Sequence, residues 1–159
     1  HKIQSGPFIT VDIIIELSDG FGNGCGNRKP HHGLLANRKP NHGPLAKGIV
    51  LIERSNPPYG WAIPGGFLDY NESVEDCAIR EAKEETSLDI YDLKQLHTYS
   101  KPGRDPRFHT VTTVFTAKGK GVPKAETDAA NLKVFKPQEA LKLDLAFDHK
   151  QVLEDYLNG

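Results

Sequence analysis

The chain has 159 residues, of which 37% are hydrophobic and 26% are charged, and its formal net charge is −1. This length and composition fit one globular domain covering residues 1–159, and the near-neutral charge excludes the overall positive field on which nucleic-acid-binding proteins rely. No apolar run approaches the roughly 18 residues of a membrane span, and the two cysteines give no disulfide framework, so we expect a cytoplasmic protein.

The N-terminal part of the chain predicts two strands. Three consecutive isoleucines within Ile9–Leu17 indicate a strand that is buried on both faces, and Gly48–Arg54 reads as a second strand. These two strands would form a hairpin if the segment between them were removed. A loop of this length inside a compact domain is usually functional, disordered or inserted.

The segment at about 20–48 is basic and rich in Gly, Pro and His. It contains no Asp or Glu and five Lys or Arg residues, and 27–35 matches 37–45 at seven of nine positions. We interpret it as an insertion. Three roles stay open: none, binding of anions or of part of a substrate, and binding of a transition metal through Cys25, His31, His32 and His42.

Short strands and helices follow. Trp61–Ile63 is expected to be a strand that ends in a turn at 64–66, and Ser73–Thr86 a helix, because Ser73 or Asn71 can cap it and acidic residues favour its first turn. The remaining expected elements are strands at Leu93–Ser100, Thr110–Ala117 and Leu132–Phe135, a short helix at Pro137–Leu141 and a terminal helix at Phe147–Leu157. This order suggests an α+β or α/β sandwich.

Three glutamates share one face of the expected Ser73–Thr86 helix. Glu81, Glu84 and Glu85 fall within a sector of about 100° on a helical wheel, where like charges repel one another. Mg²⁺ or Mn²⁺, which prefer oxygen ligands, would offset that repulsion. Arg80 could hold one carboxylate in a bidentate pair, and the turn at 64–66 could bring a backbone carbonyl close. The alternative is an ordinary solvent-exposed acidic face.

The wider spacing resembles the Nudix box, G-x5-E-x7-R-E-U-x-E-E-x-G-U. Over residues 66–88 its fixed or class positions are occupied by Gly66, Glu72, Arg80, Glu81, Ala82, Glu84, Glu85 and Leu88. Ala82 fits the aliphatic position weakly, and Ser87 replaces the second glycine. Since that glycine serves a left-handed turn at the helix end, we expect Ser87 to cost roughly 1 kcal/mol of stability without removing a metal ligand.

The resemblance implies an α/β/α Nudix sandwich with a mixed sheet and metal-dependent hydrolysis of a nucleoside diphosphate linked to another group. It further implies that Gly65, through its backbone, and Glu81, Glu84 and Glu85 bind Mg²⁺ or Mn²⁺, and that Glu84 and Glu85 belong to the catalytic machinery. Glu72 and Arg80 would support the loop and the helix.

A later loop often supplies a base or a further metal ligand in this family. Asp128 is the first candidate here and Glu126 the second, and the alternative for each is an ordinary exposed acid.

The loop that follows the Nudix box contains the residues that suggest a substrate. Pro102 lies fifteen residues after Ser87, where ADP-ribose pyrophosphatases carry a proline, and the run 104–107 resembles their bacterial and archaeal branch. Arg104 and Arg107 suit recognition of phosphate or ribose, unless Arg104 only braces the loop against Asp105. Phe8, Phe108 and Phe147 are candidates for adenine stacking, although each is more often a core residue.

The function expected from this resemblance is hydrolysis of ADP-ribose to AMP and ribose 5-phosphate with Mg²⁺. The open alternatives are another nucleotide substrate (an oxidised nucleoside triphosphate or a dinucleotide), a Nudix domain that senses a ligand without turnover, and an RNA-end processor that uses the basic segment. We expect a small-molecule nucleotide as the partner and neither membrane nor nucleic acid, and we leave a homodimer open.

Overall fold

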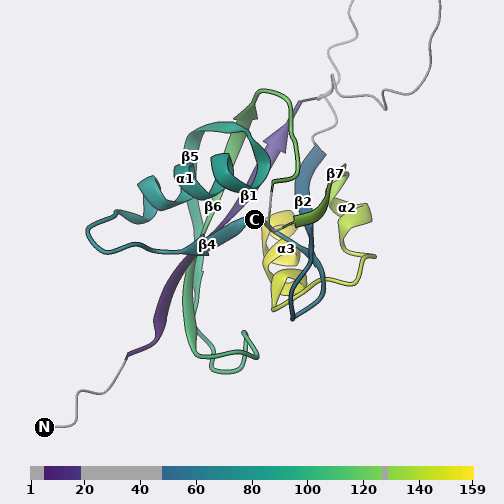
Figure 1. Ribbon diagram of the computed structural model, residues 1–159. Helices are drawn as coiled ribbons and strands as arrows, with labels where there is room; N and C mark the ends of the chain where they lie inside the picture. Colours follow the sequence, from purple (N-terminus) through teal and green to yellow (C-terminus); the bar gives the residue numbers. More distant parts are fainter. Residues whose placement is uncertain (1–5, 19–47, 127–128) are drawn as a thin grey trace, which may run out of the picture.

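The computed structural model describes residues 6–18, 48–126 and 129–159. Within these residues a mixed sheet forms with the strand order β3-β2-β1-β6-β5, while β4 pairs with β1 and β7 pairs with β2 (Figure 1). The strands are β1 (Phe8–Leu17), β2 (Gly48–Arg54), β3 (Gly60–Ala62), β4 (Gly65–Phe67), β5 (Asp89–Tyr99), β6 (Thr110–Lys120) and β7 (Ala129–Phe135). The helices are α1 (Val74–Thr86), α2 (Pro137–Ala140) and α3 (His149–Asn158).

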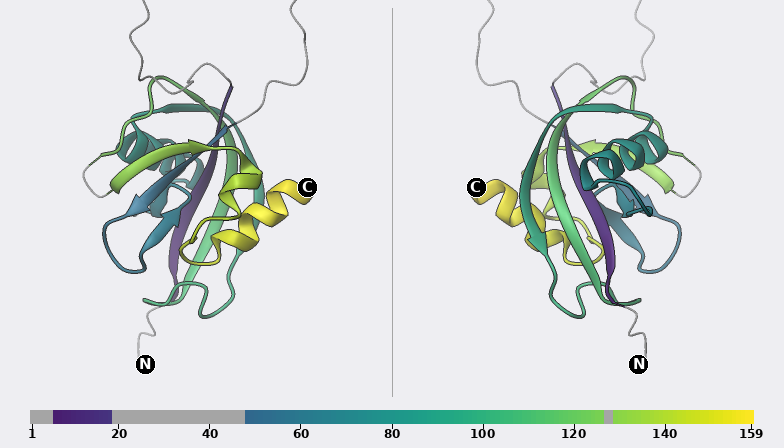
Figure 2. Two further views of the ribbon diagram at one scale, coloured as in Figure 1. Left: turned by 90° about the vertical axis from the view of Figure 1, so that its right-hand side faces the viewer. Right: turned by 90° about the vertical axis from the view of Figure 1, so that its left-hand side faces the viewer.

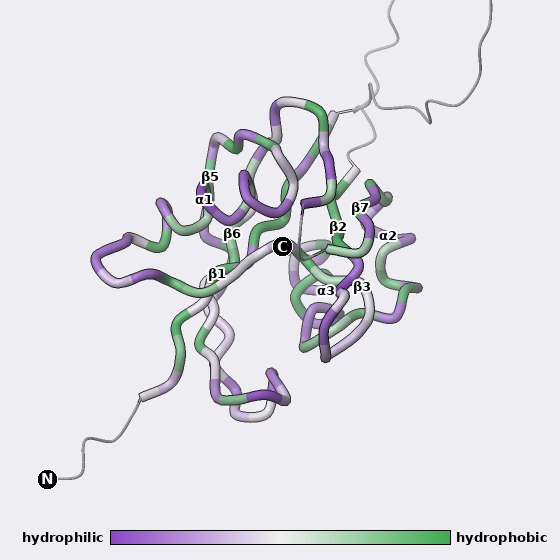
Figure 3. Tube along the Cα trace, viewed as in Figure 1, coloured by the Kyte–Doolittle hydropathy of each residue, from purple (hydrophilic) through white to green (hydrophobic). Residues whose placement is uncertain are grey.

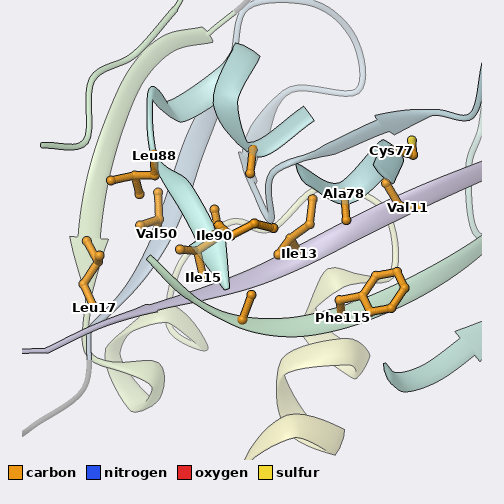
Figure 4. Packing of buried hydrophobic residues seen from close by; sticks show 12 residues of the cluster. Val11, Ile13, Ile15, Leu17, Val50, Cys77, Ala78, Leu88, Ile90 and Phe115 are labelled. Carbon is orange, nitrogen blue, oxygen red and sulfur yellow. The ribbon is translucent and has the colours of Figure 1, made fainter. Parts of the chain in front are cut away.

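Helices α1 and α3 lie on opposite faces of the sheet (Figure 2). Successive side chains of a strand point to opposite faces, and in β1 both faces are buried. Ile13 and Ile15 pack in the cluster that contains Ala78 and Ala82 of α1 (Figure 4), whereas Ile14 packs in the cluster that contains residues of α3. Hydrophilic residues mark the loop from β4 to α1 (Figure 3). The expected α/β/α sandwich with a mixed sheet is confirmed.

Helix α1 has the ends that its sequence predicts. The Ser73 hydroxyl caps its start by accepting from the Asp76 N–H at 3.1 Å. Ser87 ends it in the left-handed conformation with φ of 62°, and its N–H donates to the Lys83 carbonyl at 3.0 Å. The chain therefore adopts the turn of the box glycine with a serine in its place.

The turn expected at 64–66 is wrong in part, since Gly65–Phe67 forms β4 and pairs antiparallel with β1. Two consecutive glycines give no strand signal in the sequence, but here they permit close approach. A Cβ on Gly65 would collide with the Val11 carbonyl, and a Cβ on Gly66 would collide with the Glu81 carboxylate. Both glycines therefore let the strand lie close against its neighbours.

The hairpin expected between the first two strands is present but short. Strands β1 and β2 pair at Glu16↔Ile49 and Leu17↔Gly48. Nearer the N-terminal end of β1, β4 pairs with the same edge, at 10–12. The basic segment up to residue 47, with Cys25, His31, His32 and His42, lies outside the described residues, and Gly48 begins β2. Among the described residues no helix is long and apolar enough to cross a membrane.

Candidate active site

A cavity of about 460 Å³ opens where β1, β2, β4 and α1 meet the loop 104–107 and the residues that lead into α3. Its polar lining is divided by charge. The carboxylates come from Asp12, Asp69, Glu81, Glu84, Glu85 and Asp105, and the guanidinium groups come from Arg54, Arg104 and Arg107. One cavity therefore combines oxygen donors for a cation with groups that bind an anion.

Glu85 is the carboxylate closest to the glycine strand. Its Oε2 accepts from the Gly65 N–H at 3.0 Å. Burial raises the pKa of Glu85 to about 8; the neighbouring carboxylates of Glu81 and Asp12 also raise this pKa, while the Gly65 hydrogen bond opposes the shift. A buried carboxylate beside other carboxylates takes up a proton unless positive charge is supplied.

Arg80 holds the other acidic groups of the motif. Its Nε and Nη2 donate to Oε1 and Oε2 of Glu72 at 2.7 and 2.9 Å. Its Nη1 donates to Glu81 at 2.8 Å and to Glu84 at 3.1 Å, and Nη2 also donates to the Phe67 carbonyl at 3.0 Å. Neither Arg80 nor Glu72 is among the residues that line the cavity.

The donor set suits a hard divalent cation, although its geometry is not that of a closed metal cage. In the part of the chain that the structure describes, no three His, Cys, Asp or Glu side chains come together as a preformed metal site. Glu81 and Glu84 bind Arg80 instead, and Glu85 binds Gly65. Carboxylates are the ligands that Mg²⁺ and Mn²⁺ prefer. Glu85 is buried beside Glu81 and Asp12, surroundings that raise its pKa and favour added positive charge, so the residues present fit such an ion.

Arg104 and Arg107 lie in the same loop but have different surroundings. The Arg104 side chain is buried and donates to both oxygens of Asp148, at 2.9 and 2.6 Å, and to Thr110 at 2.6 Å. The bracing of Arg104 by Asp105 is therefore not observed. Asp105 binds Arg107 instead, with Nε and Nη2 at 3.1 and 2.9 Å.

The candidate stacking residues lie near Arg107. Its Cζ is 5.0 Å from the ring centroid of Phe108 and 5.4 Å from that of Phe147. Phe8 and Phe108 contact each other with centroids 4.7 Å apart, and both are at least partly exposed. Phe147 has a φ of 56°, which a residue with a bulky side chain adopts only when its surroundings impose it.

The cavity is also lined by Arg54, Asp12 and His149, which were not predicted from the sequence. Arg54 donates from Nε to the Pro58 carbonyl at 2.7 Å, and its Cζ is 4.8 Å from the Phe147 centroid. Burial, followed by the nearby Arg107 charge, lowers the pKa of Arg54. A charged residue inside the apolar run of β1 was an available signal for Asp12, whereas nothing local marked the other two.

Asp128 and Glu126 were the candidates for a base or a further metal ligand from the later loop. Asp128 lies outside the described residues. Glu126 accepts from the Ser87 hydroxyl at 2.6 Å and is not among the residues that line the cavity. It therefore lies at the C-terminal end of α1.

The three-layer fold and the residues from Gly66 to Leu88 together define the Nudix class. A model of the NUDIX domain matches residues 36–156, so the chain belongs to the Nudix family. It is 41% identical over 112 residues to "ADP-ribose pyrophosphatase" of Methanocaldococcus jannaschii, a match that covers 69% of this chain and 65% of that protein.

One further curated relative and one solved structure are similar to the chain. The chain is 37% identical over 112 residues to "ADPR responsive transcriptional repressor NtrR" of Acinetobacter baylyi, covering 67% of this chain and 45% of that protein. The chain thus spans less than two thirds of the length of either curated relative. The NUDIX domain of Shewanella oneidensis NrtR, solved with ADP ribose, superposes with a TM-score of 0.74 at 24% identity, covering 99% of this chain and 90% of that one. This last likeness concerns the fold.

Proposed function

We propose that the chain is a Nudix pyrophosphohydrolase that hydrolyses ADP-ribose to AMP and ribose 5-phosphate with Mg²⁺ or Mn²⁺. The observation that carries this proposal is the divided charge of the cavity. The three glutamates of α1 lie in the same cavity as Arg54 and Arg107, which suits a diphosphate whose charge is shared between metal ions and guanidinium groups. The relative from M. jannaschii, named as an ADP-ribose pyrophosphatase, supports the choice of substrate.

The carboxylates of α1 are the proposed metal ligands. Glu81, Glu84 and Glu85, with the backbone of Gly65, would hold the ions. Bound there, the ions would neutralise diphosphate charge and lower the pKa of an attacking water. Asp128 stays the first candidate for the base.

Support for these ligands is assigned to Glu72 and Arg80. Their paired hydrogen bonds fix the helix face from which the glutamates project. Both are positioning residues in this proposal.

Recognition of the substrate is assigned to the loop 104–107 and the end of β2. Arg107 and Arg54 line the cavity and would bind phosphate. Arg104 contributes by holding the loop, because Asp148 and Thr110 already occupy its guanidinium. A small-molecule nucleotide is thus the proposed partner. We place the protein in the cytoplasm and leave a homodimer open.

A ligand sensor that binds ADP-ribose without turnover is the second candidate. It is favoured by the likeness to the A. baylyi repressor. Intact carboxylates at 81, 84 and 85 argue for turnover.

Product analysis on a substrate panel separates these functions. The panel contains ADP-ribose, NADH, a diadenosine polyphosphate and oxidised dGTP, each with Mg²⁺. We expect AMP from ADP-ribose in preference to any other turnover. Preferential hydrolysis of another member would overturn the assigned substrate, and binding of ADP-ribose without turnover would favour the sensor.

A further inference from the structure

A buried histidine joins the start of α3 to the segment before β4. His149 is 1% exposed, and its Nδ1 accepts from the Ile63 N–H at 3.0 Å. Because an imidazolium has no acceptor nitrogen, this hydrogen bond requires the neutral ring with its proton on Nε2. That nitrogen lies 3.6 Å from Oδ1 of Asp12. His149 therefore lies against Ile63, which leads into β4, and against Asp12 of β1, the strand that pairs with β4.

Asp12 lies directly beside the glycine strand. It is the partner of Gly65 in the register of β1 and β4, and a Cβ on Gly65 would lie 2.5 Å from Asp12 Oδ1. Its other oxygen accepts from the Thr112 hydroxyl at 2.7 Å. The Asp12 carboxylate is thus held on β6 at one oxygen and faces His149 and Gly65 with the other.

The segment from Ile63 to Gly65 is fixed at each residue. His149 binds the N–H of Ile63, the Ile13 N–H donates to the Pro64 carbonyl at 2.8 Å, and Asp12 packs beside Gly65. The Gly65 N–H in turn donates to Glu85. A continuous set of contacts thus runs from the start of α3 to a carboxylate of the cavity.

We propose that His149 and Asp12 are positioning residues of this site, which set where the Gly65 backbone lies relative to Glu85. The proposal rests on the proposed function, because that function assigns Gly65 and Glu85 to the metal ions. Buried polar groups are costly unless they are paired, and an apolar side chain at 149 would leave the Ile63 N–H without its acceptor. Partners of this kind orient metal ligands, and their loss typically costs 10- to 100-fold in metal affinity or activity.

Binding of Mn²⁺ to the protein without substrate tests the proposal directly. Electron paramagnetic resonance of free Mn²⁺ gives the affinity for the native chain, His149→Leu and His149→Asn. The asparagine amide oxygen can replace Nδ1 as the acceptor for Ile63, whereas leucine cannot. We expect His149→Leu to weaken Mn²⁺ binding about tenfold or more and His149→Asn to restore most of that loss. In turnover, kcat should fall for His149→Leu with little change in KM for ADP-ribose.

A matched control removes general destabilisation as an explanation. Val152→Ala truncates another fully buried residue of α3 that does not line the cavity, so it should lower the unfolding temperature and leave Mn²⁺ affinity unchanged. Equal affinities for the native chain and a folded His149→Leu would overturn the proposal, as would an equal loss in Val152→Ala. If His149→Leu does not fold, Thr112→Val removes the hydroxyl that orients Asp12, and unchanged affinity there would overturn the proposal too.

The outcome is separable from that of the proposed function. If ADP-ribose is not hydrolysed but His149→Leu weakens Mn²⁺ binding, the reaction fails and the positioning role is supported. If ADP-ribose is hydrolysed and His149→Leu binds Mn²⁺ as the native chain does, the reaction is supported and the positioning role fails.

Discussion

The guanidinium of Arg80 binds the carboxylate of Glu72 through two parallel contacts, Nε to Oε1 at 2.7 Å and Nη2 to Oε2 at 2.9 Å. Glu72 precedes α1 and Arg80 lies within it, so this pair joins the loop to the helix. The hydrogen bonds from Arg80 are the largest cause that lowers the pKa of Glu72, to about 2. Through Nη1 the same guanidinium reaches Glu81, a proposed metal ligand.

Glu72→Gln should therefore impair the metal site. A neutral amide cannot accept from both nitrogens of Arg80, so the guanidinium is held less firmly against Glu81. We expect kcat to fall about tenfold or more, measured as AMP release from ADP-ribose. Glu75→Gln is the matched control, because Glu75 is an exposed acid in the first turn of α1. Equal activities of the two variants would contradict the role of the pair.

The raised pKa of Glu85 should make the stability of the metal-free protein depend on pH. Burial raises its folded-state pKa from 4.5 to about 8. Between these values the folded state retains a proton that the unfolded state releases, so this contribution to stability is present at low pH and is lost as pH rises through about 8. We expect the unfolding temperature in EDTA to fall across this window, and Glu85→Gln to remove that part of the fall. Identical pH profiles for the two proteins would show that Glu85 is not the group responsible.

Substitutions of Ser87 separate the effect of backbone strain on stability from the effect of a hydrogen bond. Its φ of 62° favours glycine, but its hydroxyl donates to Glu126 at 2.6 Å. Ser87→Gly relieves strain of about 1 kcal/mol and loses a bond of similar worth, so it should be nearly neutral. Ser87→Ala loses the bond and keeps the strain, so it should destabilise the fold by about 1 kcal/mol. Urea unfolding measures both, and the reverse order of stabilities would contradict this balance.

Arg104 and Arg107 should differ in what they support. Arg104→Ala leaves Asp148 without its buried partner and should destabilise the fold by about 3 kcal/mol. Arg107 is a third exposed, but its partner Asp105 is almost fully buried, so Arg107→Ala should raise the KM for ADP-ribose and destabilise the fold too, though less than Arg104→Ala because the Arg107 N–H still donates to Asp105. Urea unfolding and steady-state kinetics on the same variants check both expectations. A destabilised Arg107→Ala with normal KM would contradict the assignment.

The register at the end of β1 predicts that the basic segment is dispensable for the reaction. Leu17 and Gly48 are cross-strand partners, so a two-residue Asn-Gly turn in place of 18–47 should close a short hairpin. We expect this variant to hydrolyse ADP-ribose as the native chain does. Salt-sensitive RNA binding that is lost with the segment would instead support RNA-end processing.

Local patterns in the sequence predicted the elements that depend on local chemistry. Helix α1 follows from the cap at Ser73 and the acidic first turn, and the central strand follows from its isoleucines. Strand β4 was missed because Gly65 and Gly66 have no strand propensity of their own and are recruited by close packing on β1.

The site residues likewise divide into those that local sequence predicts and those that depend on tertiary contacts. The glutamates were found because they share one helix face. Arg54 and His149 were missed because each reaches the cavity only through contacts between distant parts of the chain, such as the hydrogen bond between His149 and Ile63. The spacing of residues in a single sequence does not reveal contacts between distant parts of the chain.

The most direct test of the proposed reaction is AMP release from ADP-ribose with Mg²⁺, compared between the native chain and Glu85→Gln. We predict release by the native chain that requires the metal and falls about a hundredfold in the variant, because a metal ligand is lost. Metal-dependent release that is equal in the two proteins would contradict the assignment of Glu85, and no release from the native chain would contradict the reaction itself.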